Sequence, residues 1–237
     1  MLRGVHLTVQ TGHVCLLVIR SSPIPIWTSR GTEMSANDTI DFWFMVGSTY
    51  TYLTVSRLQD VGAATQIRFR WRPFNVRAIM QEMNNIPFAT KPIKLAYMWR
   101  DVERRASRYG IPAKVPAPYP LKNLELANRV AVLGESEGWC SDYVRATYRL
   151  WFVEGKEAGA EPNLRESLCE IGQDPDRVIA LAKNDSVGRA LEANTEQAKQ
   201  LNIFGAPTFV TRGELFWGDD RLEDAIAWHR NGTLKPA

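Results

Sequence analysis

Short segments of alternating apolar residues stand at both ends of a long helical stretch, and this order limits the folds open to the chain. Residues 39–46 and 65–72 alternate as strands do, and 49–63 between them has apolar residues at helical spacing. A connection of this kind joins two parallel strands through a right-handed crossover. Residues 207–217 predict a hairpin before a final helix at 221–230. The two ends therefore predict two halves of one small sheet.

The stretch between these halves is mainly helical. Apolar residues recur at helical spacing in five segments, 76–84, 94–109, 121–135, 141–154 and 164–171. The N-cap pair Asp174-Pro175 predicts the start of a helix at 176–183, and Asp185-Ser186 predicts the start of another that runs to about residue 201. The fold class that we predict is α/β, a thioredoxin-like fold with a large all-helical insertion. Its parts are an N-terminal extension at 1–36, a thioredoxin-like domain at 37–75 and 200–237, and a helical insertion domain at 76–199.

Residues 1–33 stand apart from this pattern. They are a start-site artefact, an extra flexible arm or a targeting peptide, because Met34 offers a second start just before the first strand. They hold three Arg and one Glu, so they supply most of the chain's net charge of +3. So small a charge predicts no nucleic-acid partner. No segment approaches the roughly 18 apolar residues of a membrane span, which predicts no membrane partner.

The cysteines are too few and too scattered for a disulfide framework. Cys15, Cys140 and Cys169 are far apart and show no metal-ligand spacing, so no metal site is predicted. Free cysteines fit a reducing compartment, which predicts a cytoplasmic protein.

The first segment that can carry chemistry is the turn between the first strand and its helix. Ser48 stands at the start of the helix, where unpaired N–H groups and the helix dipole favour an anion. Redox proteins of the thioredoxin-like class have two cysteines at this turn, and residues 48–51 contain none. Disulfide exchange at this turn is therefore excluded. The alternative is that Ser48 only caps the helix.

Three further segments each allow a structural and a functional interpretation. Pro207 is an edge residue of the hairpin, or a cis-proline that leaves the backbone of Ala206 free to pair with an extended peptide ligand. Asp219 and Asp220 cap the last helix or bind a ligand's ammonium group. Asn85 is a turn former or a donor to ligand amides.

In order along the chain, these segments resemble one family from Ile40 to Arg230. The matching motifs are Asp41-Phe-Trp-Phe, Ser48-x-Tyr50-x-Tyr52-Leu53, Trp71-Arg-Pro-Phe74, Asn85-x-Pro87, Lys94-x-x-Tyr97-Met98-x-x-Asp101, Ile203-Phe-Gly-Ala-Pro-Thr-Phe209 and Phe216-Trp-Gly-x-Asp-Arg221. The chain resembles the 2-hydroxychromene-2-carboxylate isomerases, which are bacterial relatives of the kappa-class glutathione transferases with a DsbA-like fold.

The resemblance implies a glutathione-dependent cis-trans isomerase of small aromatic substrates in aromatic catabolism. Glutathione is then a cofactor whose thiolate adds to the substrate and is eliminated again, and the protein is a homodimer. By resemblance, Ser48 is the catalytic serine that hydrogen-bonds the glutathione sulfur. The implied glutathione-binding residues are Asn85, Ala206, Pro207, Asp219 and Asp220, and candidate walls for the substrate are Trp43, Tyr50, Tyr97 and Trp99. Core packing is the alternative for these aromatic residues.

Two departures from the family pattern concern the substrate. Thr49 follows Ser48 where the family commonly has proline, and Asn75-Val-Arg77 stands where it often has glycine-containing sequence. Arg77 binds a substrate carboxylate or is a solvated helix charge, and we favour the second. The alternative functions are a kappa-like glutathione transferase or peroxidase and a non-catalytic glutathione-binding module. A thiol-disulfide oxidoreductase fits poorly, because Cys140 and Cys169 fall in the helical insertion.

Overall fold

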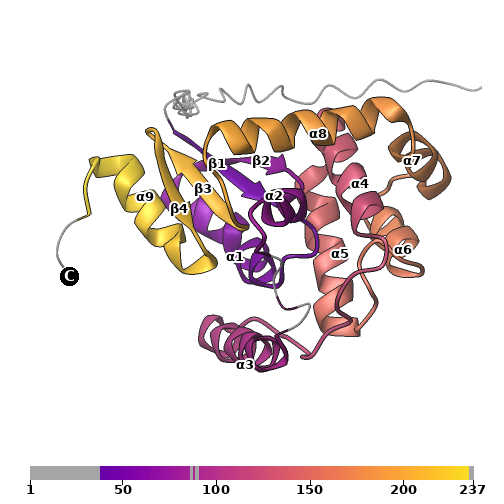
Figure 1. Cartoon of the computed structure of the whole chain (residues 1–237), viewed down its shortest axis with the longest axis horizontal. Helices are drawn as coiled ribbons and strands as arrows, with labels where there is room; N and C mark the ends of the chain where they lie inside the picture. Colours follow the sequence, from indigo (N-terminus) through magenta and orange to yellow (C-terminus); the bar gives the residue numbers. More distant parts are fainter. Residues whose placement is uncertain (1–37, 86–87, 89–90, 235–237) are drawn as a thin grey trace, which may run out of the picture. The chain divides into compact units, whose positions relative to one another are not determined.

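The sheet has four strands in the order β2-β1-β3-β4 (Figure 1). The computed structural model describes residues 38–85, 88 and 91–234. The strands are β1 (Thr39–Phe44), β2 (Arg68–Pro73), β3 (Thr208–Thr211) and β4 (Glu214–Trp217). β1 runs parallel to β2, whereas the β1–β3 and β3–β4 pairs are antiparallel. The N-terminal and C-terminal strand pairs thus form one sheet, as the alternation predicted.

The helices follow the predicted order, and their ends lie within three residues of the predicted ones in the central stretch. α1 (Thr49–Thr65) connects β1 to β2, and a 3₁₀ turn, η1 (Asp219–Arg221), leads into α9 (Leu222–Asn231). Between β2 and β3 lie α2 (Val76–Glu82), α3 (Pro92–Tyr109), α4 (Leu124–Glu137), α5 (Cys140–Glu154), α6 (Asn163–Glu170), α7 (Pro175–Ala182) and α8 (Asp185–Gln200). This is a thioredoxin-like fold with a helical insertion.

The described residues belong to one compact unit. The domain boundaries at 75–76 and 199–200 therefore stay predictions, and the proposed extension at 1–36 lies outside the described residues. None of the helices in the described part of the chain is long and apolar enough to span a bilayer.

β1 is buried on both faces, whereas its sequence predicted one apolar face. Phe42 and Phe44 lie in the main core, with Phe42 stacked on Phe209 of β3 at a ring-centroid distance of 5.5 Å. On the opposite face Trp43 packs against Phe74 at 5.8 Å in a second, smaller core. A strand between two neighbours and covered by helices on each side loses its polar face. Trp43 is therefore a core residue, and its prediction as a substrate wall was wrong.

β2 likewise differs from its predicted alternation at one position. The alternation of residues 65–72 predicts that Arg68, Arg70 and Arg72 point to solvent, and Arg68 and Arg70 are indeed exposed. The Arg72 guanidinium instead lies 3.0 Å from Glu135 of α4 and 5.1 Å from the ring centroid of Trp43. The cation is thus paired and stacked where the helical insertion covers the strand.

The turn after β1 is fixed by a glycine and by an asparagine from α4. Gly47 has φ of +118°, and a Cβ there would lie 2.4 Å from Leu124 Cδ1. The Asn128 side chain accepts a hydrogen bond from the Val46 N–H at 2.8 Å and donates one to the Val46 carbonyl at 2.9 Å. Since Asn128 is buried, these bonds replace the strand ladder where β1 ends. The insertion thus holds the turn that carries Ser48.

Replacing Gly47 with alanine is expected to destabilise the protein by about 2 kcal/mol, because side chains rarely adopt this backbone conformation. Gly110→Ala is the matched control, since Gly110 has φ of +68° and nothing within 4 Å of a Cβ. It should cost only about 1 kcal/mol. Urea unfolding of both variants measures the difference, and equal losses would contradict the role of the Gly47 turn.

Candidate functional site

Ser48 and Ala206 meet at the start of α1, as the sequence-based prediction requires. Ser48 is the N-cap residue of α1, but its side chain makes no capping hydrogen bond. Its hydroxyl instead donates to the carbonyl of Ala206 at 2.9 Å, across a sequence separation of 158 residues. The peptide bond between Ala206 and Pro207 is cis. The interpretation of Ser48 as only a helix cap is therefore wrong.

The N-terminus of α1 retains its positive character. The first turn contains no acidic residue, and the Ser48 side chain leaves its N–H groups uncapped. Uncapped N–H groups and the helix dipole together favour an anion beside Ser48. The Tyr148 hydroxyl of α5 fixes the backbone here, because it lies 3.0 Å from the Met45 carbonyl and 2.9 Å from that of Ser48. The serine is thus presented by a rigid backbone.

The backbone of Ala206 has one bonded and one available group. Its carbonyl accepts from Ser48, whereas its N–H has no hydrogen-bond partner among residues 38–85, 88 and 91–234. The next residue along the chain, Pro207, accepts at its carbonyl from the Gly218 N–H at 2.9 Å. A backbone N–H without a partner, on a half-buried residue just before a strand, is a group that can pair with an extended peptide ligand.

An aromatic pair flanks this backbone. Trp217 at the end of β4 contacts Phe204 with ring centroids 4.9 Å apart, and both side chains are substantially exposed. The indole lies so close to Gly205 that a Cβ there would be 2.1 Å from Nε1. Gly205 is thus needed for the close approach of Trp217 to the cis-proline loop.

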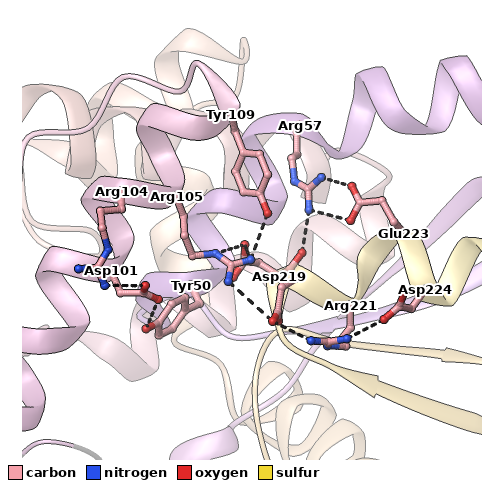
Figure 2. A network of polar contacts seen from close by, with 11 residues as sticks. Tyr50, Arg57, Asp101, Arg104, Arg105, Tyr109, Asp219, Arg221, Glu223 and Asp224 are labelled. Carbon is pink, nitrogen blue, oxygen red and sulfur yellow. Dashed lines mark hydrogen bonds and ion pairs between the residues drawn. The ribbon is translucent and has the colours of Figure 1, made fainter. Parts of the chain in front are cut away.

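Asp219 is the buried centre of a polar network that joins α1, α3 and η1 (Figure 2). Its side chain is 2 % exposed, and its carboxylate lies 2.8 Å from Nη2 of Arg105. Arg57 of α1 donates to the Asp219 carbonyl at 2.7 Å and also pairs with Glu223. Burial raises the pKa of the Asp219 carboxyl to about 6, and the Arg105 guanidinium opposes that rise. The Arg105 guanidinium, which belongs to the helical insertion, therefore compensates the charge of the buried Asp219 carboxylate.

The two acids predicted to bind glutathione occupy different environments. The Asp220 side chain is 42 % exposed and lies 3.1 Å from Arg221, which also pairs with Asp224 at 2.7 Å. Neither acid makes a side-chain capping bond to η1 or α9. The interpretation of Asp219 and Asp220 as helix caps is therefore not supported. Arg105 lies near both acids, 2.8 Å from Asp219 and 3.7 Å from Asp220, and only the Asp220 carboxylate is exposed to solvent.

The predicted substrate residues on α1 and α3 also differ in exposure. The Tyr50 hydroxyl donates to Asp101 at 3.0 Å, and burial raises its pKa, so it stays protonated. Tyr97 is 60 % exposed, with Arg104 over its ring at 5.5 Å. Trp99 is half-buried and lines, with Tyr119, a mainly apolar cavity of about 700 Å³ between α3 and residues 116–119. Of the three, Trp99 lies at a cavity wall.

Asn85 makes no hydrogen bond with Ser48 or Ala206 among the described residues. Its side chain is exposed, and its backbone N–H donates to the Met80 carbonyl at 2.8 Å. Pro87 of the same motif lies outside the described residues.

Sequence reasoning missed three residues that support the site, namely Arg105, Asn128 and Tyr148. Each acts through a contact between distant segments, with separations of 114, 82 and 100 residues respectively. Arg105 also stands among three other arginines on α3, and nothing in the local sequence distinguishes it.

A thioredoxin-type sheet, a polar residue at the start of its first helix and a cis-proline opposite that residue define a thioredoxin-fold protein. Here serine replaces the redox cysteines. Residues 39–226 match the family model of the DSBA-like thioredoxin domain, so the chain belongs to that family.

Its relatives include isomerases and glutathione transferases. It is 28 % identical to a 2-hydroxychromene-2-carboxylate isomerase of Sphingobium xenophagum over 189 residues, which are 78 % of this chain and 94 % of the relative. It is 25 % identical to glutathione S-transferase kappa 1 of Caenorhabditis elegans over 196 residues, covering 77 % and 87 % of the two chains. A solved structure of 2-hydroxychromene-2-carboxylate isomerase superposes with a TM-score of 0.71 at 24 % identity, covering 80 % and 94 %.

Proposed function

We propose that the chain is a glutathione-dependent cis-trans isomerase of aromatic substrates of the 2-hydroxychromene-2-carboxylate type. The observation that carries the proposal is the Ser48 hydroxyl at an uncapped helix N-terminus, 2.9 Å from the Ala206 carbonyl. The names of the isomerase and kappa transferase relatives support it. Aromatic catabolism in the cytoplasm by a homodimer belongs to the same proposal.

The residues at this site fit a glutathione molecule in an extended conformation. The available N–H of Ala206 would pair with the cysteinyl backbone, beside Pro207. Asp220, with Asp219 behind it, would face the γ-glutamyl ammonium group, and Asn85 would bond the tripeptide. Bound glutathione supplies a thiolate nucleophile that can add to a conjugated double bond and leave again.

Ser48 would hold that sulfur in its thiolate form. A free thiol has a pKa of about 8.5 and is mostly protonated at pH 7. A donated hydrogen bond and the N-terminus of α1 both favour the anion, so they lower this pKa. The hydroxyl carries a single proton, so it must turn from the Ala206 carbonyl to the sulfur.

The aromatic substrate would lie between the Ser48 turn and α3. α3 covers the start of α1, because Met98 accepts from the Thr49 hydroxyl at 3.0 Å and Asp101 accepts from Tyr50. Trp99 and Tyr119 offer flat apolar walls nearby, with ring centroids 5.9 Å apart. Tyr50 and Tyr97 are the other proposed substrate residues.

The stoichiometry of glutathione tests the proposal. Incubation with 2-hydroxychromene-2-carboxylate should reach the isomerisation equilibrium at catalytic amounts of glutathione, with the thiol recovered at the end. The assay follows substrate absorbance and titrates free thiol in parallel, and a reaction without glutathione serves as the control. Consumption of one thiol per turnover would instead support a kappa-like transferase, which the 25 % identical kappa relative makes the second candidate. If the substrate does not react with or without glutathione, a non-catalytic glutathione-binding module is the remaining candidate.

A further inference from the structure

We propose that Arg77 binds the carboxylate of the substrate. The inference rests on the proposed function and names the group that selects among aromatic substrates. Its basis is a cation without a carboxylate partner that lines a cavity beside the Ser48 turn. Sequence reasoning had favoured a solvated charge at this position.

The burial of Arg77 argues against a solvated helix charge. Its Nε atom is buried and has no hydrogen-bond partner among the described residues. Arg57, Arg72 and Arg129 also bury an unpartnered Nε, but each of them is paired with a glutamate through another nitrogen. Arg77 forms no ion pair within the described part of the chain. A half-buried guanidinium without an anion is costly unless a ligand supplies one.

The surroundings of Arg77 are suited to one small anion. Arg77 and Lys122 line a cavity of about 270 Å³ bounded by α2, α4 and α8. The amides of Asn75 and Asn128 line it as well. Its one acid is Glu125, which lies 2.7 Å from Arg129 and is neutralised by it. Lys122 lies 3.9 Å from Glu157, so Arg77 is the cation of this lining that has no acid partner in the described part of the chain.

The cavity adjoins the proposed catalytic turn. Leu124 and Asn128, which line it, are the residues that contact Gly47 and bond Val46, directly before Ser48. A carboxylate held at Arg77 therefore lies on the insertion side of the turn that presents the serine.

Tyr119 belongs to the apolar cavity along α3 and is a neighbour of Arg77. It lines the apolar cavity together with Trp99. The Arg77 guanidinium also lowers the pKa of the Tyr119 hydroxyl, against the rise that burial causes, so the two side chains are neighbours. An aromatic acid matches this order, with its ring against Trp99 and Tyr119 and its carboxylate toward Arg77.

Binding of 2-naphthoate and of its neutral analogue 2-naphthamide tests the site without turnover. Arg77→Gln should weaken 2-naphthoate binding by about tenfold to a hundredfold, the loss expected for one hydrogen bond to a charged group. It should leave 2-naphthamide binding unchanged, and Arg77→Lys should retain part of the affinity for the acid. Titration calorimetry measures both probes, and thermal unfolding checks each variant.

The controls separate this site from the proposed function and from a structural role. Arg68→Gln removes an exposed arginine of β2 and should leave both affinities unchanged. A structural role of Arg77 would lower the melting temperature and weaken both probes alike, which overturns the proposal. Equal 2-naphthoate binding by wild type and Arg77→Gln, or no binding by wild type, also overturns it. Loss of the proposed function would appear separately, as failure of the wild type to form a glutathione thiolate.

Discussion

Replacing Ser48 with alanine is expected to lower kcat/KM for the glutathione-dependent reaction by about a hundredfold. The variant loses the one hydroxyl that can donate to the sulfur, a donor whose removal typically costs a factor of this size. The pKa of the bound thiol should then rise toward its free value of about 8.5. Ultraviolet absorbance of the thiolate as a function of pH measures this shift, and steady-state kinetics measure the rate.

Ser56→Ala is the matched control for this prediction. Ser56 lies on the same helix, and its hydroxyl donates to the Tyr52 carbonyl at 2.8 Å, away from the start of α1. Its loss should change neither the thiolate absorbance nor the rate. An unchanged pKa of the bound thiol in Ser48→Ala would contradict the role of the serine. The helix N-terminus alone would then be the group that stabilises the thiolate.

Replacing Arg105 with methionine is expected to destabilise the protein by about 3–5 kcal/mol above pH 7. The change removes the ion-pair partner of the buried Asp219 carboxylate, and a buried charge left without its partner carries a penalty of this size. Urea unfolding at several pH values measures it. The loss should shrink as the pH falls toward 6, because the Asp219 carboxyl of the variant takes up a proton in this range and no buried charge remains.

The sign of this pH dependence follows from the pKa of Asp219. That pKa is about 6 in the folded protein against 3.8 ordinarily, so the contribution of this group to stability is present at low pH. It is lost as the pH rises through 6. Without Arg105 the pKa of Asp219 should rise further, so the difference between variant and wild type grows with pH.

Two variants control the Arg105 prediction. Arg104→Met removes the neighbouring arginine of α3, whose pair with Asp101 at 3.1 Å is largely exposed, and should cost less than about 1 kcal/mol. Adding Asp219→Asn to Arg105→Met removes the buried charge and should restore part of the stability. A loss that stays constant from pH 5 to pH 8 would contradict a buried carboxylate as its cause.

Much of the fold could be predicted because its elements carry their period in the local sequence. The strand–helix–strand start and the final hairpin gave the sheet halves, and the Asp174-Pro175 pair gave the start of α7. Asp174 indeed accepts from the Asp176 N–H at 3.0 Å. The second buried face of β1 was not predicted, because the side chains that cover Trp43 come from α2, α8 and the loops beside them.

The site was predictable where its backbone motifs are local. The meeting of Ser48 with Ala206 follows from the thioredoxin-like topology, which sets the helix start against the loop before β3. The pairing of Asp219 with Arg105 does not follow, since any of several arginines on α3 satisfies the same pattern. Arg77 was assigned wrongly to solvent for a related reason: its burial depends on the packing of α2 against distant helices.

Few buried side chains attach α3 to the rest of the protein. α3 buries only Met98, Val102 and Ala106, whereas the shorter α5 buries nine residues. A helix with few buried apolar side chains opens at a lower free energy than the core around it. Local opening of α3 would carry Trp99 away from residues 116–119 and uncover the start of α1, while Tyr148 on α5 still holds the serine turn. If the proposed function holds, bulky aromatic molecules would enter and leave past α3 without unfolding of the sheet.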